Sequence, residues 1–238
     1  MFLIIDTPTR FGSVGLWNDN ALIRVIGWKS THNHTVDLMP AIESLLTQQH
    51  IRPRDLKGLV VTLGPGGFGA LRAGLSVVKG LAFSLNLPVI GVSALEASAY
   101  VYRGFEKTVC PVLNAGHDRV AWAQFKASSA TMLRKTQDKV TSEDEFIESN
   151  GRTTLFCGEG VLSLNARLKS ALGSKIQIMD QFSPWDRLTG AAAIGSERLL
   201  NGERDNLASL QPHYLMSPTI TPPKPPRRIR PGTPAKPK

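Results

Sequence analysis

The sequence predicts an α/β protein built as two lobes that each open with a β-hairpin, and three patterns lead to this prediction. Short apolar runs over residues 2–6 and 12–17, separated by a turn, are typical of paired antiparallel strands. Apolar runs then alternate with helical stripes between 35 and 102, which favours parallel strands with helices between them. A second hairpin pattern follows over 109–113 and 120–125. We therefore expect two lobes of similar construction.

The elements of the first half follow from local signals. The turn Asn18-Asp19-Asn20 precedes a third strand over 21–28, because these side chains bond their own backbone and tolerate a left-handed φ. Over 35–49 the apolar residues fall on one helical stripe, with Pro40 in the first turn or at a kink. The continuous apolar run 56–63 indicates a central strand buried on both faces. The half ends with a helix over 70–85, a strand over 88–92 and a helix to Tyr102 that the capping box Ser93 and Glu96 opens.

The second half repeats this order with weaker signals. Its hairpin is followed by a capping box, Ser142 and Glu145, that opens a short helix. Strands are expected over 153–156 and 175–179, and helices over 161–172 and 189–200. The predicted organisation is a larger lobe over 1–104, a smaller lobe over 105–216 and a tail over 217–238.

Composition places the chain among ordinary globular proteins. Hydrophobic residues make up 42% and charged residues 20% of its 238 residues, which excludes fibrous and disordered classes. Both cysteines, Cys110 and Cys157, lie in apolar runs, so a reducing, cytoplasmic compartment is expected. The first ten residues lack the basic and long apolar regions of a secretion signal. The apolar stretch 70–85 is interrupted by charges and glycines, so no membrane span is expected.

The net charge of +9 is concentrated in the tail. From Ser217 onward there are six Lys or Arg and no acids, which leaves +3 for the rest of the chain. The tail also holds eight prolines and no aromatic residue, so we expect it to be disordered. It is interpreted as a solvated extension, with weak contact to a nucleic-acid backbone as the alternative.

A glycine-rich loop, Gly64-Pro65-Gly66-Gly67-Phe68-Gly69, follows a predicted strand and opens a helix, and it matches the G-x-G-x-x-G dinucleotide pattern. Pro65 removes a backbone donor, and the hairpin at the start of the chain is not the βαβ unit to which that pattern belongs. No Gly-Lys-Ser/Thr follows, so a P-loop is not indicated. The plainer interpretation is a tight turn from a strand into a closely packed helix.

That helix has one face of small residues. Gly66, Ala70, Gly74, Val77 and Gly80 recur at intervals of three or four residues, which favours close approach of a neighbour. The neighbour is either an element of the same chain or another subunit, and the spacing leaves both open.

Asp6, at the end of the first strand, is followed by Thr7 and Thr9. With Gly64 to Gly67 it could hold phosphates, which would make the protein a nucleotide-binding enzyme. A turn-starting Asp explains the same residue.

No catalytic group of residues emerges. His32 and His34 lack helical spacing and a third ligand, so we interpret them as solvated and expect no metal site. His117 and Asp118 lie on a hairpin turn without a neighbouring nucleophile. No cofactor is expected.

Several motifs together carry a resemblance to a known family: IIDTPT, NHTVDLMPAIESLL, GPGGFGALRAGLSVVKGLA, PVIGVSALEA and, near the end, QPHYL. They closely resemble the TsaB (YeaZ) family, the bacterial partner of TsaD in threonylcarbamoyladenosine modification of tRNA. The match is dense over 1–102 and thin afterwards. Its most specific part is the glycine loop with the start of the next helix, namely Gly64, Pro65, Gly66, Phe68 and Arg72.

The resemblance implies an actin-like (ASKHA, ribonuclease H-like) fold of two lobes, with mixed sheets flanked by helices. It implies a non-catalytic scaffold that supports a TsaD-like catalytic subunit, forms a homodimer in isolation and works beside a TsaE-like ATPase. It meets tRNA through the complex, and no membrane is involved. In the family, the helices corresponding to 35–49 and 70–85 pair with those of TsaD or of a second copy. The interface residues expected here are Leu38, Ile42, Leu45, Ala70, Ala73, Gly74 and Val77.

The chain departs from the family pattern at three places. Gly67, Gly69 and Ala70 stand where the family usually has Ser, Thr and Gly, and Pro8 replaces a Ser. The second hairpin reads Asn114-Ala115-Gly116 where the family tends to have Asp-Ala-Arg. These departures weigh against nucleotide contact at the loop, where only Asp6 and Thr9 remain as candidate contacts.

Overall fold

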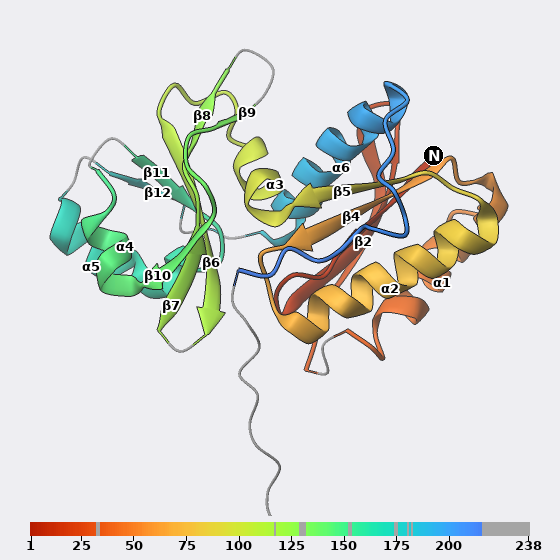
Figure 1. Cartoon of the computed structure of the whole chain (residues 1–238), viewed down its shortest axis with the longest axis horizontal. Helices are drawn as coiled ribbons and strands as arrows, with labels where there is room; N and C mark the ends of the chain where they lie inside the picture. Colours follow the sequence, from red (N-terminus) through yellow and green to blue (C-terminus); the bar gives the residue numbers. More distant parts are fainter. Residues whose placement is uncertain are drawn as a thin grey trace, which may run out of the picture.

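The computed structural model describes residues 1–31, 34–116, 118–128, 132–151, 154–173, 176–179, 181 and 183–215. Within these ranges the chain forms two β-sheets, each with helices packed against it, that lie side by side (Figure 1). The predicted tail over 217–238, His32 and His117 lie outside the described residues.

The first sheet has the strand order β3-β2-β1-β4-β5. Strand β2 is antiparallel to both β1 and β3, whereas β4 runs parallel to β1 and β5 runs parallel to β4. The parallel strands are joined through helices, as the alternation of patterns predicts. The strands are β1 (Phe2–Asp6), β2 (Phe11–Asn18), β3 (Ala21–Lys29), β4 (Gly58–Gly64) and β5 (Val89–Ser93).

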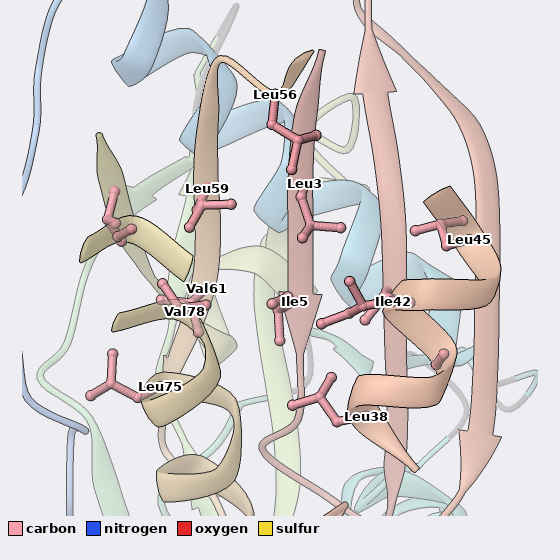
Figure 2. Close-up of a cluster of buried hydrophobic side chains, with 14 of the residues drawn as sticks. Leu3, Ile5, Leu38, Ile42, Leu45, Leu56, Leu59, Val61, Leu75 and Val78 are labelled. Carbon is pink, nitrogen blue, oxygen red and sulfur yellow. The ribbon is translucent and has the colours of Figure 1, made fainter. Parts of the chain in front are cut away.

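Both faces of the first sheet are buried. Alternate side chains of β1 point to opposite faces. Leu3 and Ile5 belong to the core beneath α1 (Leu38–Gln48) and α2 (Phe68–Leu85), whereas Ile4 belongs to the core beneath α6 (Pro184–Leu200). Figure 2 shows the first of these cores, in which side chains from α1 and α2 meet those of β1 and β4. The side chains of β1 are therefore buried on both faces of the sheet.

Helix α2 meets the length and composition of a membrane-spanning helix, which we did not expect from the sequence. A helix on the core of a globular protein meets the same criterion. Here Leu75 and Val78 of α2 are buried in the core that it shares with the first sheet.

The second sheet has the order β10-β7-β6-β11-β12, with β8 and β9 added beside β6. Its pattern of directions repeats the first sheet, because β7 and β10 are antiparallel to their neighbours whereas β11 and β12 are parallel to β6 and to each other. One face packs on α4 (Glu143–Glu148) and α5 (Val161–Leu172), and the other faces α3 (Ala94–Tyr100). The strands are β6 (Thr108–Gly116), β7 (Arg119–Trp122), β8 (Phe125–Ala127), β9 (Met132–Arg134), β10 (Lys139–Ser142), β11 (Thr154–Cys157) and β12 (Gln177–Ile178).

The last part of the chain does not follow the sequence-based division at 104. Helix α6 begins five residues earlier than expected, at Pro184, and packs on the first sheet through Leu188, Ala191 and Ala192. The segment after it continues along the same lobe, where the amide of Asp205 bonds the carbonyl of Val89. Residues 184–210 therefore lie with the first lobe, because their apolar residues complete its two cores, whereas Leu215 packs against a core of the second lobe.

Other boundaries shift by a few residues. Helix α1 begins at Leu38 instead of 35, α2 begins at Phe68 instead of 70, and a one-turn 3₁₀ helix, η1 (Pro53–Asp55), precedes β4. Both capping boxes are confirmed at their serines, because the hydroxyls of Ser93 and Ser142 accept the amides of Glu96 and Glu145.

Candidate functional site

A cleft of about 970 Å³ lies between the two lobes. Its walls come from the β1–β2 turn, the segment before α1 and the start of α2 on one side, and from β6 and the start of α5 on the other. Two cations, Arg10 and Lys29, and one acid, Glu159, line it. The remaining lining residues are Pro8, Thr9, Phe11, Ser30, Thr31, His34, Gly67, Ala70, Asn114, Leu162 and Ser163.

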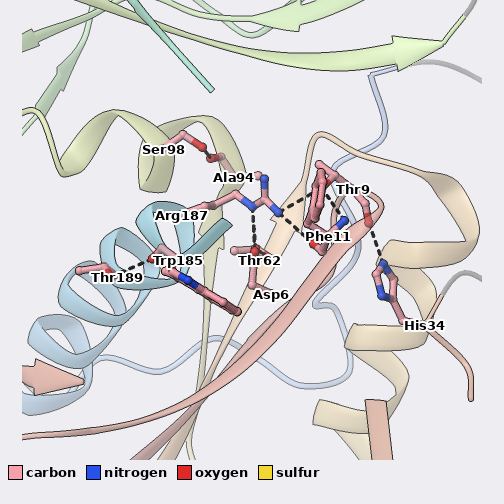
Figure 3. Close-up of polar contacts among 10 residues, drawn as sticks. All are labelled: Asp6, Thr9, Phe11, His34, Thr62, Ala94, Ser98, Trp185, Arg187 and Thr189. Atoms are coloured by element: carbon pink, nitrogen blue, oxygen red, sulfur yellow. Dashed lines mark hydrogen bonds and ion pairs between the residues drawn. The ribbon is translucent and has the colours of Figure 1, made fainter. Parts of the chain in front are cut away.

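Beside the cleft, Asp6 is held in a buried ion pair with Arg187 (Figure 3). Nε of Arg187 donates to both carboxylate oxygens of Asp6 at 2.9 Å, and the two side chains are 1% and 0% exposed. The hydroxyl of Thr62 donates to the same carboxylate at 2.8 Å. Burial opposes the charge on Arg187, but Asp6 and then Glu159 outweigh it, so the pKa of the guanidinium is raised. The carboxylate of Asp6, the predicted phosphate contact, is thus already paired with a cation of the chain itself.

Thr9, the second candidate nucleotide contact, belongs to the same network. Nη2 of Arg187 donates to the Thr9 hydroxyl and to the carbonyl of Phe11, both at 3.3 Å. Thr9 and Glu159 of the second lobe line the same cleft. Burial raises the pKa of Glu159, and Arg187 opposes that rise.

The glycine loop packs against the β1–β2 turn of the same chain. The amide of Gly67 donates to the carbonyl of Pro8 at 2.7 Å. A Cβ on Gly66 would lie 2.2 Å from that carbonyl oxygen, so the loop lies directly against the β1–β2 turn. Gly64 has a φ of +115°, which a residue with a side chain rarely adopts. This confirms a tight strand-to-helix turn.

A magnesium–nucleotide, which an actin-like fold could hold in this cleft, does not fit these residues. Its carboxylate would be Asp6, which Arg187 neutralises, and its phosphate-binding amides would come from a loop in which Pro65 has none and Gly67 is already bonded. Among the described residues, no group of three His, Cys, Asp or Glu side chains could hold a metal.

His34 is not solvated, contrary to our sequence-based interpretation. It is 1% exposed, its Nε2 donates to the carbonyl of Thr9 at 2.7 Å, and its Nδ1 accepts from the indole of Trp28 at 2.9 Å. Burial lowers its pKa, so it is the neutral tautomer that ties the β1–β2 turn to the segment before α1. Asp118 lies in a hairpin turn with a φ of +55°.

Arg72 and Phe68 of the glycine-loop motif contact Tyr214 of the QPHYL motif. The guanidinium of Arg72 lies 3.8 Å from the centre of the Phe68 ring, and its Nε donates to the hydroxyl of Tyr214 at 3.1 Å. The rings of Phe68 and Tyr214 are 4.5 Å apart. The glycine-loop motif and the closing QPHYL motif therefore contact each other, a pairing that no local pattern could indicate.

Most of the interface residues predicted from the sequence face inward. Leu38, Ile42 and Leu45 of α1 lie in the core on the first sheet, and Ala70 and Gly74 of α2 are also buried. A Cβ on Gly74 would lie 2.3 Å from the hydroxyl of Thr7, so the small-residue face approaches β1 of the same chain. Only Ala73 and Val77 are partly exposed. The apolar stripe of each amphipathic helix therefore packs against the sheet of its own chain.

Other apolar side chains remain exposed on the opposite side of these helices. Val36, just before α1, is 63% exposed, Met39 of α1 is 48% exposed and Phe83 of α2 is 85% exposed. Helices α1 and α2 cover the same side of the sheet (Figure 1). We call this surface the outer helical face, and it comprises Val36, Met39, Ala73, Gly80 and Phe83.

Comparison with known proteins agrees with these features. The family model described as "TsaD: tRNA N6-adenosine threonylcarbamoyltransferase" matches residues 26–199. A Bacillus subtilis protein named tRNA threonylcarbamoyladenosine biosynthesis protein TsaB is 29% identical over 218 residues, which cover 90% of this chain and 93% of the relative. An Escherichia coli protein of the same name is 33% identical over 126 residues, 52% of this chain and 54% of the relative.

The fold is shared with solved structures. YeaZ from Pseudomonas aeruginosa superposes with a TM-score of 0.71 at 23% identity, over 90% of this chain and 99% of that one. The predicted actin-like fold of two lobes with mixed sheets is confirmed. The chain therefore belongs to the TsaD family and, within it, to the TsaB (YeaZ) proteins.

Proposed function

We propose that this protein is a non-catalytic subunit of the machinery that makes threonylcarbamoyladenosine in tRNA, and that it binds and supports a TsaD-like catalytic subunit. The observation that carries the proposal is the outer helical face, where Met39 and Phe83 are exposed on two neighbouring helices. Met and aromatic side chains are enriched in the cores of protein–protein interfaces. The name of the Bacillus subtilis relative supplies the pathway.

The chemistry of the cleft supports the non-catalytic part of the proposal. Asp6, the acid best placed for phosphate or metal chemistry, is paired with Arg187, and the neighbouring loop bonds its own β1–β2 turn. A catalytic acid or metal ligand needs a free lone pair directed at its substrate. The catalytic groups are then those of the partner subunit.

The partner would bind by burying the outer helical face. The same surface can pair with that of a second copy, because two-fold pairing places equivalent helices against each other. We therefore propose a homodimer in isolation that gives way to the heterodimer. A TsaE-like ATPase, tRNA reached through the complex and a cytoplasmic location complete the proposal.

The test is light scattering after size-exclusion chromatography of the full chain, alone and mixed with the TsaD-like subunit of its host. We expect a homodimer alone and a heterodimer in the mixture. The double variant Met39→Asp, Phe83→Asp should be monomeric and fail to bind, with an unchanged circular dichroism spectrum. Its control is Leu133→Asp, which places an aspartate at a 56% exposed apolar residue of the second lobe. Normal heterodimer formation by the double variant would refute the interface.

The alternative function, a nucleotide-binding enzyme, is favoured only by the volume of the cleft. Titration calorimetry of magnesium–ATP into the isolated protein separates the two functions. A subunit of the proposed kind gives no saturable heat, whereas an enzyme would bind ATP with micromolar affinity.

A further inference from the structure

Arg187, besides its ion pair with Asp6, lies where the chain passes from one lobe to the other. Arg187 lies in the first turn of α6, where the chain returns from the second sheet to the first. Its side chain is the largest charged group that is fully buried in the described part of the protein. It therefore occupies the junction of the lobes and not the interior of one of them.

Two acids, one from each lobe, act on this guanidinium. Asp6 ends β1 of the first sheet and binds Arg187 directly. Glu159 follows β11 of the second sheet, is 8% exposed, and lines the cleft together with Thr9, whose hydroxyl accepts Nη2 of Arg187 at 3.3 Å. The residue before it, Gly158, lines a small cavity together with Arg187.

The backbone of the second lobe fixes Glu159 in this place. Gly158 has a φ of +91°, and a Cβ there would lie 2.6 Å from the carbonyl oxygen of Val112. That carbonyl accepts the amide of Gly160 at 2.9 Å. The loop is thus held against β6, so Glu159 can leave the junction only if the second lobe moves with it.

We propose that Arg187 is an internal counter-cation that holds the two lobes closed. Two carboxylates in one desolvated junction repel each other, and each loses its hydration. A guanidinium carries its charge at all physiological pH values, so it can attract both acids at once and offset part of their repulsion. Closure then depends on a residue of the chain and needs no bound cation or nucleotide.

The proposal predicts what happens when the cation is removed. In Arg187→Met, Asp6 and Glu159 remain buried without a counter-charge, and opening of the cleft is the movement that rehydrates both. Arg187→Met, Glu159→Gln removes the charge of the second lobe and should close the cleft again. A purely steric role for Arg187 gives no such rescue, because Gln has almost the same shape as Glu.

Distances between spin labels, measured by pulsed electron paramagnetic resonance, test this in the full chain. Labels on Arg54→Cys and Ser170→Cys report on one exposed site in each lobe, and excess unlabelled protein removes signals between chains. Cys110 and Cys157 are fully buried, and burial raises their pKa, so they do not react with the label. Thr62→Val is the matched control, because its hydroxyl supports Asp6 only within the first lobe.

We expect one narrow distance distribution in the wild type, unchanged by magnesium–ATP and by Thr62→Val. Arg187→Met should shift it to longer distances, and the added Glu159→Gln should shift it back. If Arg187→Met does not fold, the same comparison is made in the Asp6→Asn, Arg187→Met background, with and without Glu159→Gln. An unchanged distribution without Arg187, a shift that Glu159→Gln fails to reverse, or closure of the wild type by magnesium–ATP would each overturn the proposal.

Discussion

The two sheets share strand order and strand directions but differ in how they are covered. The first sheet lies between α1 and α2 on one face and α6 on the other, and β1 and β4 are buried along nearly their whole length. The second sheet has shorter outer strands, with α4 and α5 on one face and the seven-residue α3 on the other. The same topology can thus support a large rigid lobe and a smaller one.

The loops after β4 and β11 show a second difference. Each contains a glycine with positive φ, Gly64 and Gly158, where the strand turns into a helix. The first loop bonds its neighbouring turn, whereas the second presents Glu159 to the junction. Topology therefore determines where a loop lies, and local residues determine what it presents there.

The largest effect should come from breaking the junction between the lobes. Arg187→Met leaves Asp6 buried without a counter-charge, which should lower the free energy of unfolding by about 3–5 kcal/mol. Asp6→Asn, Arg187→Met should recover much of this loss, because neutral groups then replace both charges. Urea denaturation measures both variants. Equal losses in the two variants would show that packing, and not charge, is what Arg187 supplies.

A smaller effect should come from the contact between α3 and α6. A Cβ on Gly190 of α6 would lie 1.9 Å from the carbonyl oxygen of Ala97, so the helices must separate to accept it. Gly190→Ala should cost about 1–3 kcal/mol of unfolding free energy, as overpacking usually does. Gly80→Ala is the control, because nothing lies within 4 Å of a Cβ there and alanine favours the helix. The idea of a tightly packed junction is abandoned if both variants are equally stable in urea.

The two capping boxes allow a direct comparison between the lobes. Ser142→Ala should cost about 0.5–2 kcal/mol, which is the usual value for loss of an N-cap. Ser93→Ala should cost more, because its hydroxyl also accepts Nη2 of Arg134 from the second lobe at 3.2 Å. Thermal and urea unfolding of the two variants give the ranking, and the reverse order would contradict the cross-lobe role of Ser93.

The smallest effects should appear in the pH dependence of stability, with opposite signs in the two lobes. Burial lowers the pKa of His34, so its contribution is complete above about pH 6.5 and is lost as the pH falls and the unfolded chain binds the proton. Burial raises the pKa of Glu159, so the folded protein binds that proton first and gains stability as the pH falls.

Urea midpoints of the wild type, His34→Asn and Glu159→Gln between about pH 7.5 and pH 5 test these signs. The difference in urea midpoint by which the wild type exceeds His34→Asn should become smaller toward low pH. Any difference by which Glu159→Gln exceeds the wild type should also become smaller toward low pH. Parallel pH profiles for all three proteins would contradict both assignments.

Most of the interface residues predicted from the sequence are buried in the chain's own core for a physical reason. Helical periodicity finds the apolar stripe, and in α1 that stripe, with Leu38, Ile42 and Leu45, is what packs the helix on its own sheet. The useful signal was the opposite one, namely Met39 and Phe83, apolar residues off the stripe. His34 was misplaced in a similar way, because its partners Thr9 and Trp28 come from other elements.

The sequence by itself determined the local features: the hairpins, the helices and their serine caps, the glycine turn at Gly64 and the family motifs. These depend on the periodicity and conformational preferences of neighbouring residues. Only the tertiary structure decided that Asp6 meets Arg187, 181 residues later, and that residues 184–210 return to the first lobe. Pairing of distant charges depends on how the chain closes on itself, and no local pattern encodes that closure.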